Sequence, residues 1–100
     1  MYAILWRFRP LVGLESEFEG AYGPSGEWAS LFNRGDGYLG TELLRHSDDP
    51  REYLTVDCWI SRDAYKTFLD RFDSEYRQLD RRLEGLTEQE ILLGTFETQP

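Results

Sequence analysis

The segment TVDCWISRDAYKTFLDRF, residues Thr55 to Phe72, decides the fold because it joins a strand to a helix. Alternation before Ser61 predicts a strand with two distinct faces. Ser61 can accept a hydrogen bond from the first helical turn, so the helix is predicted to begin after it. One face of the strand carries Leu54, Val56, Cys58 and Ile60, and the other carries Tyr53, Thr55, Asp57 and Trp59.

The helix after Ser61 is predicted to be one long element that ends near Gly85. Its apolar residues recur at intervals of three and four after the first turn, which places them in one narrow stripe. The charged residues on its other side are interpreted as a solvated face. The stripe consists of Tyr65, Phe68, Leu69, Phe72, Tyr76, Leu79, Leu83 and Leu86.

Working back toward the N-terminus, MYAILWRFRP alternates and predicts a first strand that stops at Pro10. Residues 14–22 carry a helical apolar stripe, and Gly23-Pro24 is expected to break that helix. Ser25 is predicted to cap the second half of this bent helix. The apolar face of the strand is formed by Tyr2, Ile4, Trp6 and Phe8, and the helical stripes are Leu14, Phe18, Ala21 and Tyr22, then Trp28, Leu31 and Phe32.

Two β-rich runs, residues 37–46 and 52–60, are joined by five polar residues and predict a hairpin, and residues 90–97 supply a last strand. The order is therefore βαββαβ in a single domain spanning 1–100. Right-handed crossovers give an α+β, ferredoxin-like fold: a four-stranded antiparallel sheet with two helices on one face. The other face would stay uncovered, so we expect a homodimer that pairs two sheets.

Composition excludes several classes of function. Nineteen acidic residues against 11 basic residues give a net charge of −8, which opposes binding to nucleic acid or to anionic membranes. No segment approaches the ~20 apolar residues of a membrane span, and a cytoplasmic protein is expected. A single cysteine, Cys58, cannot form an internal disulfide and is interpreted as a buried structural thiol. One histidine, His46, rules out a multi-histidine metal site.

Three residues at the strand-to-helix junction are candidate catalytic residues, and each has a structural alternative. Asp57 could act as a general base, or could form an ion pair with Arg7 or Arg45. Trp59 could line a pocket or pack in the core beneath the helix. The Tyr65 hydroxyl could anchor a substrate or reach solvent. Residues that could form the opposite wall, or simply the helix core, are Tyr22, Trp28 and Phe32.

With these elements placed, the chain resembles the antibiotic biosynthesis monooxygenase domain, a family with a dimeric α+β barrel fold. The resemblance is carried by GYLGTELLR at residues 37–45 and by WISRDAYKTF at residues 59–68. It implies oxidation of a small phenolic, quinol or polyketide-like aromatic substrate by O2, with no flavin or metal. Trp59 and Tyr65 match the indole and phenol that line the site in anthrone-oxidising relatives. Those relatives place an asparagine where this chain has Thr55, which together with Phe68 is expected to contact substrate.

Two further interpretations remain open. A non-catalytic dimeric domain that binds a small ligand or regulates a partner would use the same scaffold without a reaction. A haem-binding or haem-degrading protein matches less well, because the second helix has no histidine and His46 belongs to the hairpin.

Overall fold

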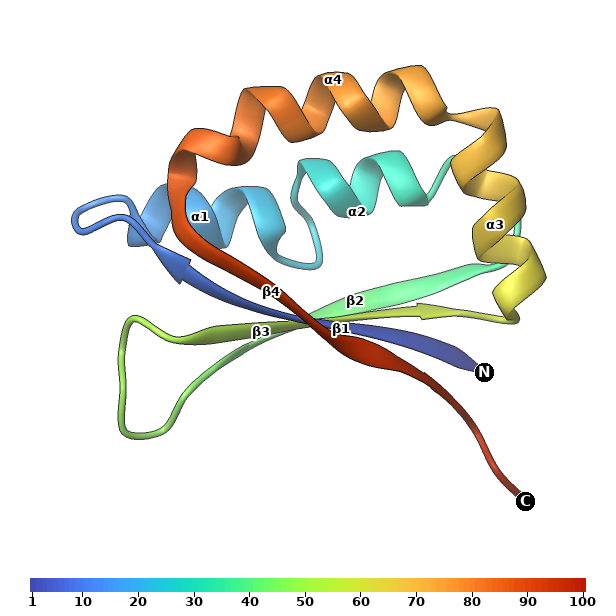
Figure 1. Cartoon of the computed structure of the whole chain (residues 1–100), viewed down its shortest axis with the longest axis horizontal. Helices are drawn as coiled ribbons and strands as arrows, with labels where there is room; N and C mark the ends of the chain where they lie inside the picture. The colour runs from blue at the N-terminus through green and yellow to red at the C-terminus, as the bar shows by residue number, and fades with distance from the viewer.

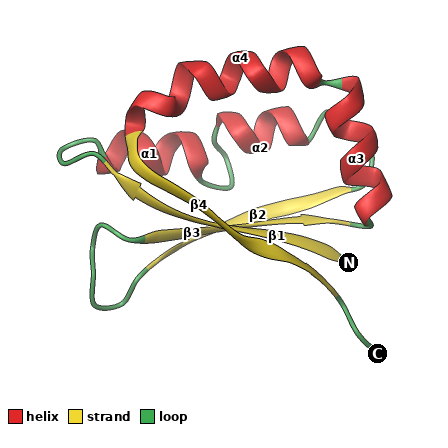
Figure 2. Cartoon of the chain, in the orientation of Figure 1, coloured by secondary structure: helices red, strands yellow, loops and turns green.

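We describe the protein from a computed structural model that covers residues 1–100. One layer of helices covers one face of a four-stranded sheet, and the other face is open (Figures 1 and 2). None of the helices combines the length and the hydropathy that a membrane span requires. In chain order the elements are β1 (Tyr2–Pro10), α1 (Glu15–Tyr22), α2 (Glu27–Phe32), β2 (Tyr38–Arg45), β3 (Tyr53–Trp59), α3 (Arg62–Arg71), α4 (Asp73–Leu83), a 3₁₀ turn (Glu84–Leu86) and β4 (Thr87–Glu97).

The sheet has the order β2-β3-β1-β4, and every neighbouring pair is antiparallel. This confirms the predicted ferredoxin-like arrangement. The register pairs Trp6 with Thr55 and Ile4 with Asp57 across the two central strands. Asp57 therefore lies in the middle of the sheet, on the face that the helices cover.

The first helix is divided as predicted, but its second half begins differently. The N-cap of α2 is Gly26, not Ser25, and no side chain caps the helix. A Cβ atom at position 26 would collide with the backbone carbonyl oxygens of Gly20 and Ala21, so only glycine fits the tight connection. The prediction of a Ser25 cap is wrong because close backbone packing determines where this helix begins.

The second helix starts as predicted and then breaks. The Ser61 hydroxyl accepts a hydrogen bond from the backbone N–H of Ala64 at 3.1 Å. At Phe72 the backbone leaves helical geometry (φ −113°, ψ 27°), which separates α3 from α4. The prediction of one long helix is wrong, because the break lets α4 run back over α2 (Figure 1). The helix also ends at Leu83, before Gly85.

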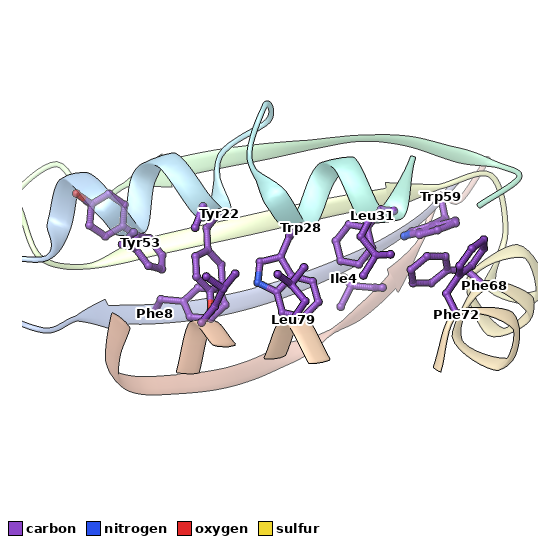
Figure 3. Close-up of a cluster of buried hydrophobic side chains, with 14 of the residues drawn as sticks. Ile4, Phe8, Tyr22, Trp28, Leu31, Tyr53, Trp59, Phe68, Phe72 and Leu79 are labelled. Atoms are coloured by element: carbon purple, nitrogen blue, oxygen red, sulfur yellow. The ribbon is translucent and has the colours of Figure 1, made fainter. Parts of the chain in front are cut away.

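The core between the helices and the sheet is mostly aromatic. The ring centroids of Phe18 and Tyr22 lie 4.5 Å apart, and those of Trp59 and Phe68 lie 5.1 Å apart. Figure 3 shows Trp59 with Phe68 and Phe72 at one end of this core, with Tyr22 and Trp28 nearer the other end. These rings form one continuous cluster, because Phe32 contacts Trp28 as well as Trp59, and only part of the cluster borders the cavity described below.

The open face of the sheet carries many apolar side chains, together with Arg7 and Glu42, which pair with Leu54 and Val56. Its central strands present Leu5, Leu54 and Val56, which are partly buried by their neighbours. On the edge strands, Leu44 pairs with Leu54 and is 46% exposed, and Phe96 pairs with Ala3 and is 55% exposed. Cys58 also lies on this face, and partial burial raises the pKa of its thiol. The thiol interpreted from the sequence as buried is thus partly buried in the single chain, on the face away from the helices.

Candidate functional site

A cavity of about 160 Å³ lies between the sheet and the helices. Its lining comes from the central strands β1 and β3, the edge strand β4, the divided first helix (α1 and α2), and α4. Six of its ten lining residues are hydrophobic, and three of the others are acidic. The lining consists of Trp6, Phe8, Tyr22, Trp28, Phe32, Thr55, Asp57, Tyr76, Asp80 and Glu90.

The cavity brings together five of the eight residues predicted to form the site. Asp57 and Thr55 lie on its floor, which β3 provides, and three aromatic residues come from α1 and α2. The five are Tyr22, Trp28, Phe32, Thr55 and Asp57. The other three, Trp59, Tyr65 and Phe68, lie outside the lining.

Trp59 is packed as a core residue, with none of its surface exposed. Its ring centroid lies 5.5 Å from that of Tyr65 and 6.0 Å from that of Phe32. The chain passes so close at Gly35 that a Cβ atom there would be 3.2 Å from the indole ring. No hydrogen-bond acceptor reaches the indole nitrogen of Trp59. The assignment of Trp59 and Tyr65 as catalytic residues stays a prediction.

Asp57 is the buried polar centre of the cavity. Only 8% of its surface is exposed, and the Thr41 hydroxyl donates a hydrogen bond to its Oδ1 atom at 2.6 Å. Burial raises the pKa of the Asp57 carboxyl to about 6, against the opposing effect of the Thr41 hydrogen bond. The alternative ion pair with Arg7 or Arg45 does not form, since neither residue is within salt-bridge distance of Asp57.

Thr41 and Tyr38 extend this polar centre toward the edge of the sheet. Because Thr41 has one hydroxyl hydrogen and donates it to Asp57, it is free to accept the hydrogen of Tyr38, whose oxygen lies 2.5 Å away. Tyr38 is half-buried, and that burial raises its pKa. The three side chains form a continuous hydrogen-bonded chain from the cavity to edge strand β2.

The hydrogen-bonded chain of Tyr38, Thr41 and Asp57 was not predicted from the sequence because β2 is irregular. Residues three apart on a regular strand point to opposite faces. A register shift between Tyr38 and Gly40, where Gly40 has φ +131°, brings Tyr38 and Thr41 to the same face. The glycine inside the strand pattern was the available signal for a bulge.

Five lining residues were not predicted as part of the site: Trp6, Phe8, Tyr76, Asp80 and Glu90. Burial, together with nearby Asp80, raises the pKa of Tyr76 to about 12, so its phenol is neutral. Asp80 and Glu90 are exposed, and the Tyr22 hydroxyl donates to Glu90 at 3.4 Å. The exposure of Asp80 agrees with the solvated face expected for its helix, and α4 also brings this residue to the border of the cavity.

The remaining ionisable candidates lie away from the cavity. His46 is in the hairpin, where its Nδ1 atom accepts hydrogen bonds from the backbone of Asp48 and Asp49 at 3.0 and 3.2 Å. No group of three or more His, Cys, Asp or Glu side chains is arranged to hold a metal ion. Because the Nδ1 atom of His46 accepts hydrogen bonds from its own hairpin, the structure gives no support to a haem-ligand role for this residue.

The strand order β2-β3-β1-β4 and the helical layer on one face define a ferredoxin-like α+β domain of the dimeric α+β barrel type. A family model described as antibiotic biosynthesis monooxygenase matches residues 1–76. The chain belongs to the antibiotic biosynthesis monooxygenase family.

Solved structures support the fold assignment. The chain is similar to SnoaB, a cofactor-independent oxygenase from Streptomyces nogalater, at 23% identity over 99% of this chain and 93% of SnoaB. The TM-score is 0.81 against the structure of an alanine variant of SnoaB and 0.76 against another SnoaB structure. It is also similar to Rv0793 from Mycobacterium tuberculosis, at 14% identity over 99% and 95% of the two chains, with a TM-score of 0.71. A search of curated proteins finds no match. At these identities the likeness concerns the fold.

Proposed function

We propose that the protein is a monooxygenase that oxidises a small phenolic or quinol-type aromatic substrate with O2 and without a bound cofactor. The observation that carries the proposal is Asp57, a buried carboxylate with a pKa of about 6 on the floor of an aromatic cavity. Such a group is ionised near neutral pH and can accept a proton. Family membership and the fold shared with SnoaB, a cofactor-independent oxygenase, support the same reaction class.

Asp57 would begin the reaction by taking the proton of the substrate hydroxyl. The resulting phenolate is electron-rich and transfers one electron to O2, and the two radicals then combine to form a ring peroxide. Asp57 returns its proton to the terminal peroxide oxygen. Loss of the ring hydrogen forms a carbonyl and breaks the O–O bond, releasing hydroxide that the lost proton converts to water. A phenol and O2 thus give a quinone and water.

Thr41 would act as a positioning residue in this scheme, because it fixes one oxygen of the carboxylate and stabilises its charge. The aromatic walls would keep water out and hold the substrate ring against the floor of the cavity. Tyr38 would complete the hydrogen-bonded chain at the strand edge.

The test is O2 consumption by purified protein incubated with a panel of phenols, quinols and hydroxylated anthrones. We expect uptake above the background rate for at least one compound, with quinone formation followed by absorbance. Asp57→Asn should abolish it. Asp70→Asn, which removes an exposed carboxylate of α3 outside the cavity, is the matched control. Background rates for every compound would overturn the proposal.

A second candidate is a non-catalytic domain that binds a small aromatic ligand. It is favoured by one observation: Trp59 and Tyr65, which match the site of oxidising relatives, do not line the cavity. In that case a ligand should change tryptophan fluorescence through Trp28, while Asp57→Asn leaves O2 consumption unchanged at background.

We further propose that the protein is a homodimer formed through the open sheet face. The support comes from the apolar side chains of that face, which include exposed Leu44 and Phe96. A solution mass of one subunit at micromolar concentration, measured by light scattering, would overturn this proposal.

A further inference from the structure

The charged residues that line the cavity are all acidic. Three of its ten residues are carboxylates, Asp57, Asp80 and Glu90, and none is Lys, Arg or His. None of the three forms a salt bridge elsewhere in the protein. Elsewhere on the surface acidic residues do find cations, as Glu88 does with Arg9 and Arg51. The cavity therefore has negative charge that the chain itself does not neutralise.

The walls of the cavity suit a cation as well. Trp6, Trp28, Tyr22 and Tyr76 present aromatic rings, whose faces attract positive charge. Burial raises the pKa of both tyrosines, so their rings remain neutral phenols. A cation near these walls would meet both carboxylate charge and ring faces, whereas an anion would meet only repulsion.

One unsatisfied donor points to a polar atom on the same ligand. Trp28 is 8% exposed, and its indole N–H makes no hydrogen bond of normal geometry, although it lies near enough to the Tyr22 hydroxyl to oppose part of the rise that burial causes in the pKa of that phenol. A buried donor without a partner is unfavourable, and a ligand oxygen would satisfy it. Figure 3 shows this nitrogen on the side of the ring that faces Tyr22, in the region of the cavity-lining rings.

The volume limits the size of the ligand. A cavity of about 150 Å³ in another protein holds one benzene molecule, and this cavity has about 160 Å³. It accommodates a single ring, and a fused polycycle such as an anthrone would extend out of its open side. The carboxylates also do not converge as metal ligands, since no group of three could hold a metal ion. An organic cation fits this arrangement better than a metal ion.

We infer that the cavity selects monocyclic phenols that carry a protonated amine and discriminates against aromatic carboxylates. This inference names the substrate class of the proposed oxidation and rests on that proposal for the reaction. The ammonium group would lie toward exposed Asp80 and Glu90, and the phenolic hydroxyl toward buried Asp57.

The inference is tested by binding, measured separately from turnover. Tryptophan fluorescence at low salt and neutral pH is titrated with three phenols of similar size: 4-(2-aminoethyl)phenol, 4-ethylphenol and 3-(4-hydroxyphenyl)propanoate. We expect the amine to bind at least about tenfold more tightly than the carboxylate, a difference of about 1.4 kcal/mol. The neutral phenol should lie between them, and added salt should reduce the difference.

Variants assign the preference to the carboxylates at the cavity. Glu90→Gln and Asp80→Asn should each reduce the ratio between amine and carboxylate affinities. Glu97→Gln is the matched control, because it removes the same charge from exposed β4 outside the lining and should leave the ratio unchanged. Equal affinities, tighter binding of the carboxylate, or no binding of any of the three would overturn the inference. Tight and selective amine binding without O2 consumption would support the inference and contradict the proposed oxidation.

Discussion

Replacing Thr41 with valine removes the only side chain that donates a hydrogen bond to Asp57. Valine has nearly the same shape, so the change acts mainly on the hydroxyl group. That hydroxyl stabilises the charged form of the carboxyl, and its loss must raise the pKa of Asp57 above its present value of about 6. A hydrogen bond to a charged group contributes about 1.5–3 kcal/mol, which corresponds to about one to two pKa units.

The assay is the pH dependence of kcat/KM for O2 consumption with the best substrate. The wild-type rate should fall as pH decreases through about 6, because protonated Asp57 cannot act as a base. In Thr41→Val this decrease should occur about one to two pH units higher, while the rate well above that pH approaches the wild-type value. The carboxyl carbon of Asp57, followed by NMR, gives the same pKa without relying on turnover.

Thr41→Ser is the control, since it keeps the hydroxyl and should keep the acid limb within a few tenths of a pH unit of wild type. A Thr41→Val profile that coincides with wild type, or that moves to lower pH, would refute the reasoning. So would an NMR titration of Asp57 that is unchanged by the loss of the hydroxyl.

Three further predictions concern stability and assembly. Burial raises the pKa of Asp57 in the folded state from 3.8 to about 6, so the folded protein binds this proton more tightly than the unfolded chain does. The unfolding free energy of wild type relative to Asp57→Asn should therefore fall by up to about 3 kcal/mol as pH rises from 4 to 7. Unfolding free energies from urea titrations that change equally with pH in the two proteins would contradict this. Ser61→Ala should lower the unfolding free energy by about 1 kcal/mol through loss of a helix cap, and an unchanged denaturation midpoint would argue against the cap. Leu44→Glu combined with Phe96→Glu should shift the light-scattering mass from two subunits to one, and a mass that stays dimeric would place the interface elsewhere.

The fold was predictable because its strands alternate clearly and its turns carry strong signals. On β1 and β3 the apolar period places residues such as Tyr2 and Trp59 on the helix-covered face, and the structure has them there. The break at Phe72 was not predictable from the same pattern. Apolar residues recur at three and four on both sides of the break, so the stripe looks continuous even though the backbone turns.

The site was predicted less completely, because it depends on how the helices and strands pack in the tertiary structure. Asp57 could be identified from its place among aromatic neighbours on one strand. Trp59 could not be assigned from sequence to a cavity or to the core, because both positions require the same alternation. Asp80 and Glu90 resemble ordinary surface residues in sequence, and only the placement of α4 and β4 around the same cavity shows that they border it.

The bulge at Gly40 determines from which side of the cavity the Asp57 carboxyl is held. Strands β2 and β4 form opposite edges of the sheet, and the exposed acidic residues of the cavity belong to α4 and β4. The hydrogen-bonded chain of Tyr38, Thr41 and Asp57 therefore holds the carboxyl from the β2 side, while Asp80 and Glu90 border the cavity from the other side. Removing the bulge, for instance with Gly40→Val, should separate Tyr38 from Thr41 and leave the β4 side of the cavity unchanged.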